Sequence, residues 1–472
     1  MSLNVRYYFW ILLVLCLISL LVPLFLRTTF SNGLYIGEET YRSLRLGQNI
    51  REGSFLSYDN LSYGGKYLFE ERLWYFLISI APGFMVIFLP ILFGILSFIV
   101  FYLLVSEIKP ELKEIASLIL IISPTFIYFF NIATKYTAAL FFILLGFYLF
   151  KKNKFYLSYF IFILSGLFSI VSLLIVCFIF LYYSLKKEDF SHFYILFFGF
   201  ILLFLVQFYR VFTLGLPKFL FPFKEFTFSN FFSFLIFGFG NQYGIGVFMF
   251  FLALIGIYCI YNEKYKFLLV YLFILLLFLL SFYFNFILLF LLFLLSFFAA
   301  AGIYHFWNDP WKSDVFRFLT LVVIICGLLF VNLSFYKGVS EIQPKVNYFE
   351  SISFLSQQEG DFVVLSDSSL GEYIKYAGKK TFIDNDYLYA PDFDIRLNDF
   401  NSLLISNDIN NTLEILGRYK IEYILIDKNN KDYQDEKGIL FILKNSRNIF
   451  VNLFENDEVS VWYNRGILHR NI

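Results

Sequence analysis

The sequence has few charged residues: Asp, Glu, Lys and Arg make up only 15% of its 472 residues. A soluble globular chain carries about a quarter, so this composition argues against a soluble enzyme. The net charge is +1, whereas a nucleic-acid-binding protein needs a basic surface. Apolar residues are abundant instead, with 59% of the chain hydrophobic and 23% aromatic. The composition predicts an α-helical, multi-pass membrane protein with no nucleic-acid partner.

Histidine and cysteine are scarce as well. Of the three histidines, His192 and His305 fall on the cytoplasmic side of the topology predicted below, and His469 lies at the extreme end. A Ser–His triad or a His-rich metal site at the outer face is therefore not expected. Each of the four cysteines stands alone in an apolar run: Cys16, Cys177, Cys259 and Cys326. This spacing excludes a disulfide framework and a CxxC metal site.

Apolar segments recur along the first 336 residues. A membrane-spanning helix needs about 20 apolar residues to cross roughly 30 Å of hydrocarbon. The sequence predicts about eleven spans, near 7–26, 74–105, 115–130, 135–150, 155–169, 170–184, 191–212, 243–261, 267–283, 285–306 and 317–336. The first lacks a small-residue cleavage site and is followed by more spans, which indicates an anchor and not a cleavable signal peptide.

The segment 155–184 sets the predicted orientation. Lysines lie before it, in 151–154, and after it, in 186–187. A single crossing would place one basic cluster outside, against the positive-inside rule. Two short half-spans, broken near Ser165-Gly166 and Ser169, keep both clusters in the cytoplasm. The N-terminus is then cytoplasmic and the C-terminal domain extracytoplasmic.

The composition changes near Tyr336. Residues 1–336, the predicted transmembrane domain, carry 22 Lys and Arg against 15 Asp and Glu, whereas residues 337–472, the tail, carry 15 against 21. Short apolar runs alternate with polar turns in the tail: DFVVLSD (361–367), KTFID (380–384) and IEYILID (421–427). This pattern predicts the strands of a small soluble α/β domain.

The predicted topology places the tail on the outer face together with two long loops, 27–73 and 213–242. Residues 27–73, the first loop, are too many for a simple connector. No Asp or Glu lies deep within a predicted span. Proton-coupled pumps and many ion-driven transporters carry such carboxylates as relays, so that class is disfavoured, while a flippase for a hydrophobic substrate stays open. Chemistry is expected on the outer face of a cell membrane.

Two adjacent carboxylates, Glu38 and Glu39, follow the first predicted span. Near the membrane surface they can meet the head group of a lipid whose tail stays among the membrane lipids. Such a pair can hold a divalent cation such as Mg²⁺ or Mn²⁺ through oxygen ligands, or one carboxylate can act as a base. A structural interpretation is equally open, because acids favour helix N-termini and a helix is predicted over 40–51.

Two cations, Lys135 and Arg210, lie at the outer ends of predicted spans. Either could pair with a phosphate at the interface. The simpler interpretation is that each extends toward lipid head groups without a substrate role.

The segment GEETYRSLR (37–45) has an acid, an aromatic residue two positions on and an arginine six positions on: Glu39, Tyr41 and Arg45. It resembles the catalytic Asp-x-aromatic-x-x-x-Arg segment of oligosaccharyltransferase catalytic subunits, within the type C (GT-C) membrane glycosyltransferases. YDNLSYGG (58–65) and the eleven-span core with an outer C-terminal domain are further similarities. In the tail, 368–386 is similar to the stretch that follows the acceptor-binding WWDYG motif of that family, with Gly371 at the last motif position.

The chain also departs from that pattern. Positions 367–370 read Asp-Ser-Ser-Leu where the family has Trp-Trp-Asp-Tyr, so sequon recognition is not supported. The segment NIATKY (131–136) lacks the acid pair of the family's second outer loop, and Glu39 replaces an Asp. The chain looks more like an outlying lipid-sugar glycosyltransferase, of the broader kind that includes protein mannosyltransferases and aminoarabinose transferases.

The resemblance implies an enzyme that moves a sugar or glycan from a polyprenyl-phosphate carrier to a protein or glycan acceptor at the outer face. It implies that Glu39, assisted by Glu38, binds a metal or activates the acceptor. The substrate-binding residues that it implies are Tyr41 and Arg45, Asp59 for the acceptor, and Lys135 and Arg210 for the leaving phosphate. The lost acceptor motif and the missing acid pair keep a second interpretation open, a non-catalytic scaffold or lipid-glycan-binding subunit with the same fold.

Overall fold

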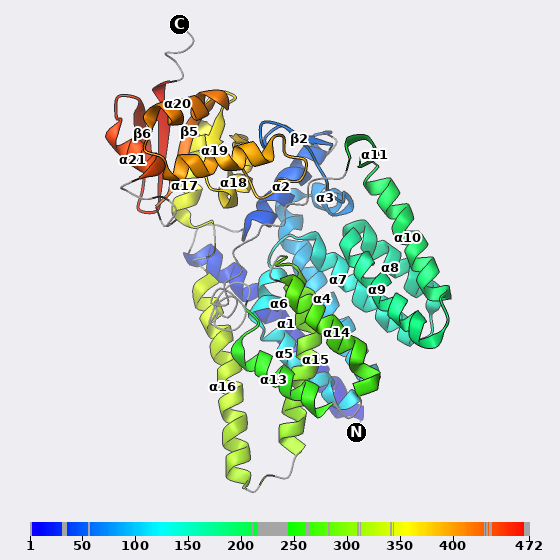
Figure 1. The fold of residues 1–472 in the computed structure, drawn as a ribbon. Helices are drawn as coiled ribbons and strands as arrows, with labels where there is room; N and C mark the ends of the chain where they lie inside the picture. The colour runs from blue at the N-terminus through cyan, green and yellow to red at the C-terminus, as the bar shows by residue number, and fades with distance from the viewer. Residues whose placement is uncertain are drawn as a thin grey trace.

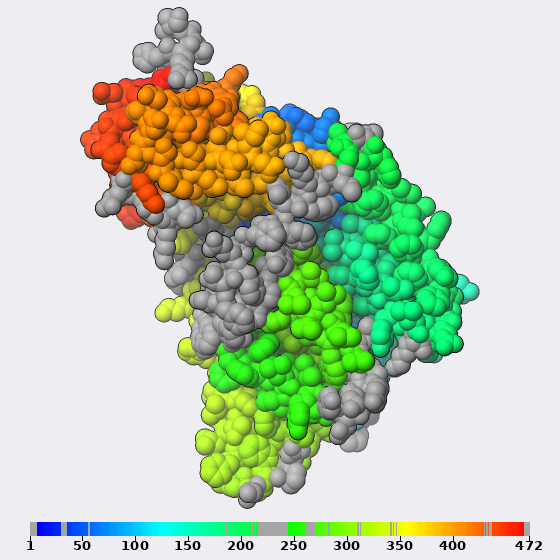
Figure 2. All heavy atoms as spheres, viewed as in Figure 1, coloured from blue at the N-terminus to red at the C-terminus, as the bar shows by residue number. Residues whose placement is uncertain are grey.

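The computed structural model describes residues 2–30, 35–54, 57–209, 211–215, 244–260, 264–281, 284–308, 311, 313–339, 342, 344–428, 430, 433 and 437–466. The molecule is mostly helical, and the tail lies at one end of the helical part (Figure 1). Figure 2 shows the tail, orange to red, seated against the upper end of the helices. Arg210 lies outside the described residues, and so does the predicted outer segment 213–242 except for residues 213–215.

Within the described chain, four helices are long and apolar enough to cross a membrane: α1 (Ser2–Phe30), α4 (Pro82–Ile108), α15 (Ile287–Asn308) and α16 (Asp314–Gly338). The other helices of this part are α5 (Lys113–Ile121), α6 (Pro124–Phe129), α7 (Lys135–Lys151), α8 (Phe155–Phe168), α9 (Ile170–Lys187), α10 (Ser191–Gln207), α11 (Val211–Leu214), α13 (Val247–Cys259) and α14 (Lys264–Ser281). Every predicted span falls mainly on helix, but 74–105 is divided into α3 (Leu73–Ser79) and α4, 115–130 into α5 and α6, and 191–212 into α10 and α11. Pro82 and Pro124 begin α4 and α6, because proline lacks the N–H that would continue the preceding helix. Eleven crossings remain a prediction.

Helices α8 and α9 form the helical hairpin predicted over 155–184. Ser169 is extended between them and caps α9 with its side chain. The ring of Phe150, in the last turn of α7, lies 5.2 Å from that of Phe155, at the start of α8, and 5.8 Å from that of Tyr183, near the end of α9. Both ends of the hairpin therefore lie together at one end of the bundle.

The tail contains the predicted small α/β region. Its sheet has the order β4-β3-β5-β7-β6, in which β3, β4 and β5 are parallel and β6 and β7 antiparallel. The strands are β3 (Val363–Leu365), β4 (Lys380–Thr381), β5 (Ile421–Asp427), β6 (Phe450–Glu455) and β7 (Val459–Asn464). The helices are α17 (Val346–Gln357), α18 (Gly371–Tyr376), α19 (Phe393–Ile405), α20 (Ile409–Arg418) and α21 (Gly438–Asn445). Strand β5 is apolar from Tyr423 to Ile426 because alternate residues of this stretch enter two separate cores, one on each face of the sheet.

The first loop folds into α2 (Glu38–Arg51) and a hairpin of β1 (Tyr58–Asp59) and β2 (Lys66–Tyr67). Helix α3 (Leu73–Ser79) follows the loop and lies within the predicted span 74–105. The first loop packs directly on the tail. The Leu61 carbonyl accepts a hydrogen bond from the Thr381 backbone N–H of β4, at 2.8 Å, and Tyr63 is buried in one of the tail's cores. The first loop and the tail therefore lie on the same side of the helical part.

Candidate active site

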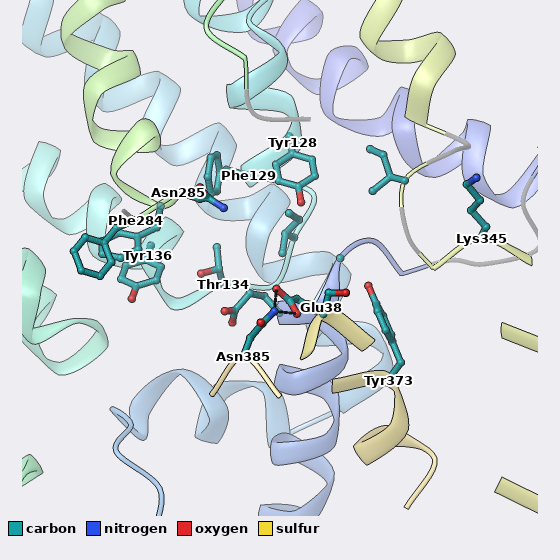
Figure 3. A pocket seen from close by; sticks show the side chains of 16 residues that line it. Glu38, Tyr128, Phe129, Thr134, Tyr136, Phe284, Asn285, Lys345, Tyr373 and Asn385 are labelled. Atoms are coloured by element: carbon teal, nitrogen blue, oxygen red, sulfur yellow. Dashed lines mark hydrogen bonds between the residues drawn. The ribbon is translucent and has the colours of Figure 1, made fainter. Parts of the chain in front are cut away.

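A cavity of about 680 Å³ lies where the first loop, the tail and the helical part meet. The chain enters it at Gly37, whose φ of +75° suits glycine, and α2 then begins at Glu38. The lining residues come from all three parts: Gly37, Glu38, Glu39, Tyr128, Phe129, Ile132, Thr134, Tyr136, Phe284, Asn285, Phe286, Ile342, Lys345, Ser369, Tyr373 and Asn385. Figure 3 shows Glu38 between Tyr136 and Phe284 on one side and Lys345 on the other. The cavity has the size of a typical small-molecule site.

Glu38 is held by the tail. The Asn385 side-chain amide donates to both Glu38 carboxylate oxygens, at 3.0 and 3.3 Å (Figure 3). Burial in the protein raises the pKa of Glu38 to about 7, and the negative charges of Glu39 and Glu372 add to this rise. The hydrogen bond from Asn385 opposes it.

Glu39 lies beside it on the cavity wall with a free carboxylate. Within the described chain, no hydrogen bond or ion pair joins Glu39 to another side chain, and its exposed surface faces the cavity. The surrounding protein raises the pKa of Glu39 by desolvation, although the nearby charges of Arg42 and Lys135 oppose the rise. A carboxylate in these surroundings suits a proton acceptor or a ligand for a cation.

Both glutamates also stand in the first turn of α2, where the helix dipole favours acids. This position fits the structural interpretation of the pair and leaves the functional one a prediction. The N-cap residue is Gly37, and among the described residues no side chain caps the helix.

Behind the cavity wall lies an ion cluster that ties α2 to the tail and to the helical part. Its members are Arg42, Arg45, Lys66, Lys135 and Lys375 with Asp59, Glu70, Glu71, Glu372, Asp384 and Asp386. No side chain in it is more than 14% exposed. Buried charges are costly unless each is paired, so the cluster fixes how the three parts meet.

Arg42 is the centre of this cluster. It lies one turn after the cavity glutamates and contacts Glu70 and Asp386, both at 2.7 Å. Lys135 contacts Glu70 at 2.6 Å and also pairs with Glu71. Desolvation opposes a charge on Arg42, but these carboxylates raise its pKa well above the usual value. Lys135 was expected from its position to bind a phosphate. In the structure it forms ion pairs with two carboxylates instead.

Of the other predicted substrate-binding residues that the structure describes, Tyr41 and Arg45 lie on α2 and Asp59 lies on β1. Arg45 makes a two-pronged ion pair with Asp59, and neither lines the cavity in the described structure. The ring of Tyr41 packs edge-on against Tyr373 and Tyr376. The structure brings these residues into one region, next to the cavity glutamates.

Two cavity residues were missed by the sequence analysis, Asn385 and Lys345. Lys345 precedes α17 and pairs with Glu458 of the tail at 2.8 Å. Its segment is held by Arg27, at the end of α1, which donates to the carbonyls of Ile342 and Pro344. Among the described lining residues, Lys345 is the one with a positive charge. The residues around Lys345 in the sequence do not indicate that it lines a cavity.

The segment that stands where the resembling family has its acceptor motif also reaches the cavity. Ser369 lines it, and Gly371 begins α18 directly against Asp384. A Cβ at position 371 would lie 2.3 Å from the Cβ of Asp384, so only glycine fits there.

The donor set for a metal is small. Within the described residues, no group of three or more His, Cys, Asp or Glu side chains could hold a metal ion. Glu38 and Glu39 offer two carboxylates, and Mg²⁺ is often bound by one or two carboxylates together with substrate phosphates and water. The residues fit a cation of that kind.

The fold is that of the type C (GT-C) membrane glycosyltransferases, as the resemblance predicted. The apo structure of the Archaeoglobus fulgidus oligosaccharyltransferase has a TM-score of 0.61 at 12% identity, covering 88% of this chain and 69% of that one. ArnT from Cupriavidus metallidurans, bound to undecaprenyl phosphate, has a TM-score of 0.53 at 11% identity over 98% of both chains. The mycobacterial arabinofuranosyltransferase AftD has a TM-score of 0.56 at 12% identity, covering 96% of this chain and 39% of that one. No protein-family model and no curated protein sequence matches the chain.

Proposed function

We propose that this protein is a membrane glycosyltransferase that moves a sugar or glycan from a polyprenyl-phosphate carrier to a protein or glycan acceptor. The observation that carries the proposal is Glu39, a carboxylate without a described partner in a cavity between the tail and the helices. A lipid head group can enter such a site while its chain stays in the membrane. Two similar structures contain undecaprenyl phosphate and dolichol-phosphate, and a third has a tethered acceptor peptide.

In this proposal the acceptor nucleophile attacks the anomeric carbon of the sugar. The bond from that carbon to the phosphate oxygen breaks, and the polyprenyl phosphate leaves with the bonding electrons. Glu39 accepts the proton of the acceptor, which its raised pKa favours. The cavity contributes chiefly by holding donor and acceptor together.

The leaving phosphate needs positive charge. Lys345 is the described cation on the cavity wall, and Arg210 stays a candidate from the sequence. Lys135 and the Arg45–Asp59 pair then act through the ion cluster, by fixing α2. When a divalent cation is bound, Glu39 and Glu38 would hold it, and it would neutralise charge on the phosphate.

The proposed location is a cell membrane, with the N-terminus cytoplasmic and the tail and cavity on the outer side. This follows from the lysines at the ends of the α8–α9 hairpin and the positive-inside rule.

The test uses purified protein in lipid bilayers with extracted polyprenyl-phosphate sugars and a panel of peptide and glycan acceptors. We expect transfer of label from the lipid to one acceptor class. Binding of the lipid-linked sugar without transfer to any acceptor would contradict the proposal and favour the scaffold interpretation.

A further inference from the structure

The tail touches the cavity glutamates through the loop 384–386, which joins β4 to the segment before α19. The two outer residues of this loop, Asp384 and Asp386, are anchored in the ion cluster. Asp384 pairs with Lys375 at 3.0 Å, with both side chains fully buried, and accepts a hydrogen bond from Ser62 at 2.7 Å. Such a buried contact fixes the loop on one side.

Asp386 fixes the other side of the loop. Its carboxylate contacts Arg42 of α2 and Lys66 of β2, both at 2.7 Å. The loop is therefore attached to the first loop at residues from two different elements, one of which is the helix that carries the cavity glutamates.

Asn385 lies between these two anchors and points into the cavity (Figure 3). Its amide donates to both oxygens of Glu38, so that carboxylate has a fixed orientation. Glu39, the next residue, has the same chemistry and no described partner. The two glutamates thus differ because of one side chain that the tail supplies.

We infer that Asn385 is a positioning residue that holds Glu38 in place and leaves Glu39 as the carboxylate that meets the acceptor. Without the amide, the Glu38 carboxylate is free to turn toward Glu39 and compete with it for the acceptor. The tail is then part of the reaction site and not only a cover over it. This inference rests on the proposed function.

The test is a double-mutant cycle of Asn385→Ala and Glu38→Ala, with kcat and KM measured for sugar transfer. Asn385→Ala should lower kcat about tenfold, within the range for residues that orient a reacting group, with KM for the donor within about twofold. The double variant should be no slower than Glu38→Ala alone, because no Glu38 carboxylate is left to hold. Asn385→Ser, which keeps a donor, should recover part of the loss.

Asn411→Ala is the matched control, since Asn411 also lies in the tail and donates to a side chain, Ser402, away from the cavity. It should transfer sugar at the wild-type rate, and all variants should show wild-type thermal unfolding. Undiminished kcat in Asn385→Ala, or losses that multiply in the double variant, would overturn the role of Asn385. A wild-type protein that transfers no sugar would overturn the proposed function itself, and this inference with it.

Discussion

Arg45 and Asp59 form a buried two-pronged ion pair, with Nη1–Oδ1 and Nη2–Oδ2 distances of 3.0 and 2.7 Å. The side chains are 6% and 2% exposed. Burial alone would raise the pKa of Asp59, but the Arg45 guanidinium lowers it to about 2. The pair fixes α2 on the β1–β2 hairpin and so holds Glu39 at the cavity.

Breaking this pair should destabilise the protein strongly. Arg45→Met leaves a buried carboxylate unpaired, and we expect a loss of about 3–5 kcal/mol in the free energy of unfolding. Replacing both partners, Arg45→Met with Asp59→Leu, should recover part of this loss. Thermal unfolding in detergent measures the effect.

Arg418→Ala is the matched control for that experiment. Arg418 also contacts two acids, Asp399 and Glu414, but it is half exposed. Its removal should lower the free energy of unfolding far less than Arg45→Met does, because an exposed ion pair contributes little to stability. Equal losses for Arg418→Ala and Arg45→Met would contradict the account of the buried pair.

The part of the fold that follows from local patterns could be predicted from the sequence. The apolar runs at 361–367 and 421–427 gave strands with residues in the cores on both faces of the sheet. The run at 380–384 gave the edge strand β4, and its Phe382 and Ile383 enter one core. A break within 155–184 was also predictable, since lysines at both ends argue against a single crossing. The structure has the break at Ser169, whereas Ser165 and Gly166, also predicted to lie at it, are inside α8. Strands β6 and β7 were missed because their residues form no distinctive apolar run; β7 pairs with β5 and β6 pairs with β7, both antiparallel.

The candidate site was only partly predictable. Glu39 was proposed because its spacing to Tyr41 and Arg45 resembles a known segment; it lies on the cavity wall, and its role stays a prediction. Asn385 was missed because it is 347 residues from Glu38 in sequence, and nothing near Asn385 indicates that contact. Lys135 was predicted to bind a phosphate because it lies at the end of a predicted span. The sequence did not indicate that the carboxylates of Glu70 and Glu71 would pair with it.

The α8–α9 hairpin predicts which residues share a side of the membrane. Single cysteines at Lys152 and Lys187, introduced into a chain without its own cysteines, should label with a membrane-impermeant reagent only after the membranes are permeabilised. The reason is that both positions lie at the same end of the bundle and are basic. Labelling of one position and not the other in sealed cells would contradict the hairpin topology.

Lys345 should affect binding of the lipid phosphate. Lys345→Ala removes the described cation from the cavity wall, so KM for the lipid-linked donor should rise about tenfold or more, as for the loss of a charged hydrogen bond. Lys345→Arg should keep most of the affinity. Initial rates at varied donor concentration measure this effect.

The control for Lys345 is Lys428→Ala. Lys428 pairs with Glu455 at 2.7 Å, as Lys345 pairs with Glu458, but it lies on the exposed surface of the tail. Its removal should leave KM unchanged. A similar rise in both variants would show that the loss of a tail ion pair, and not phosphate binding, explains the Lys345 result.

The most direct test of the account is sugar transfer by Glu39→Gln, which keeps the size of the side chain and removes its charge. We expect activity to fall at least about a hundredfold, the low end for a positioned general base, with normal insertion and unfolding temperature. Glu39→Asp should retain part of the activity, and Glu38→Gln should lose less than Glu39→Gln. Wild-type turnover of the lipid-linked sugar by Glu39→Gln would contradict the central claim that this carboxylate performs the chemistry.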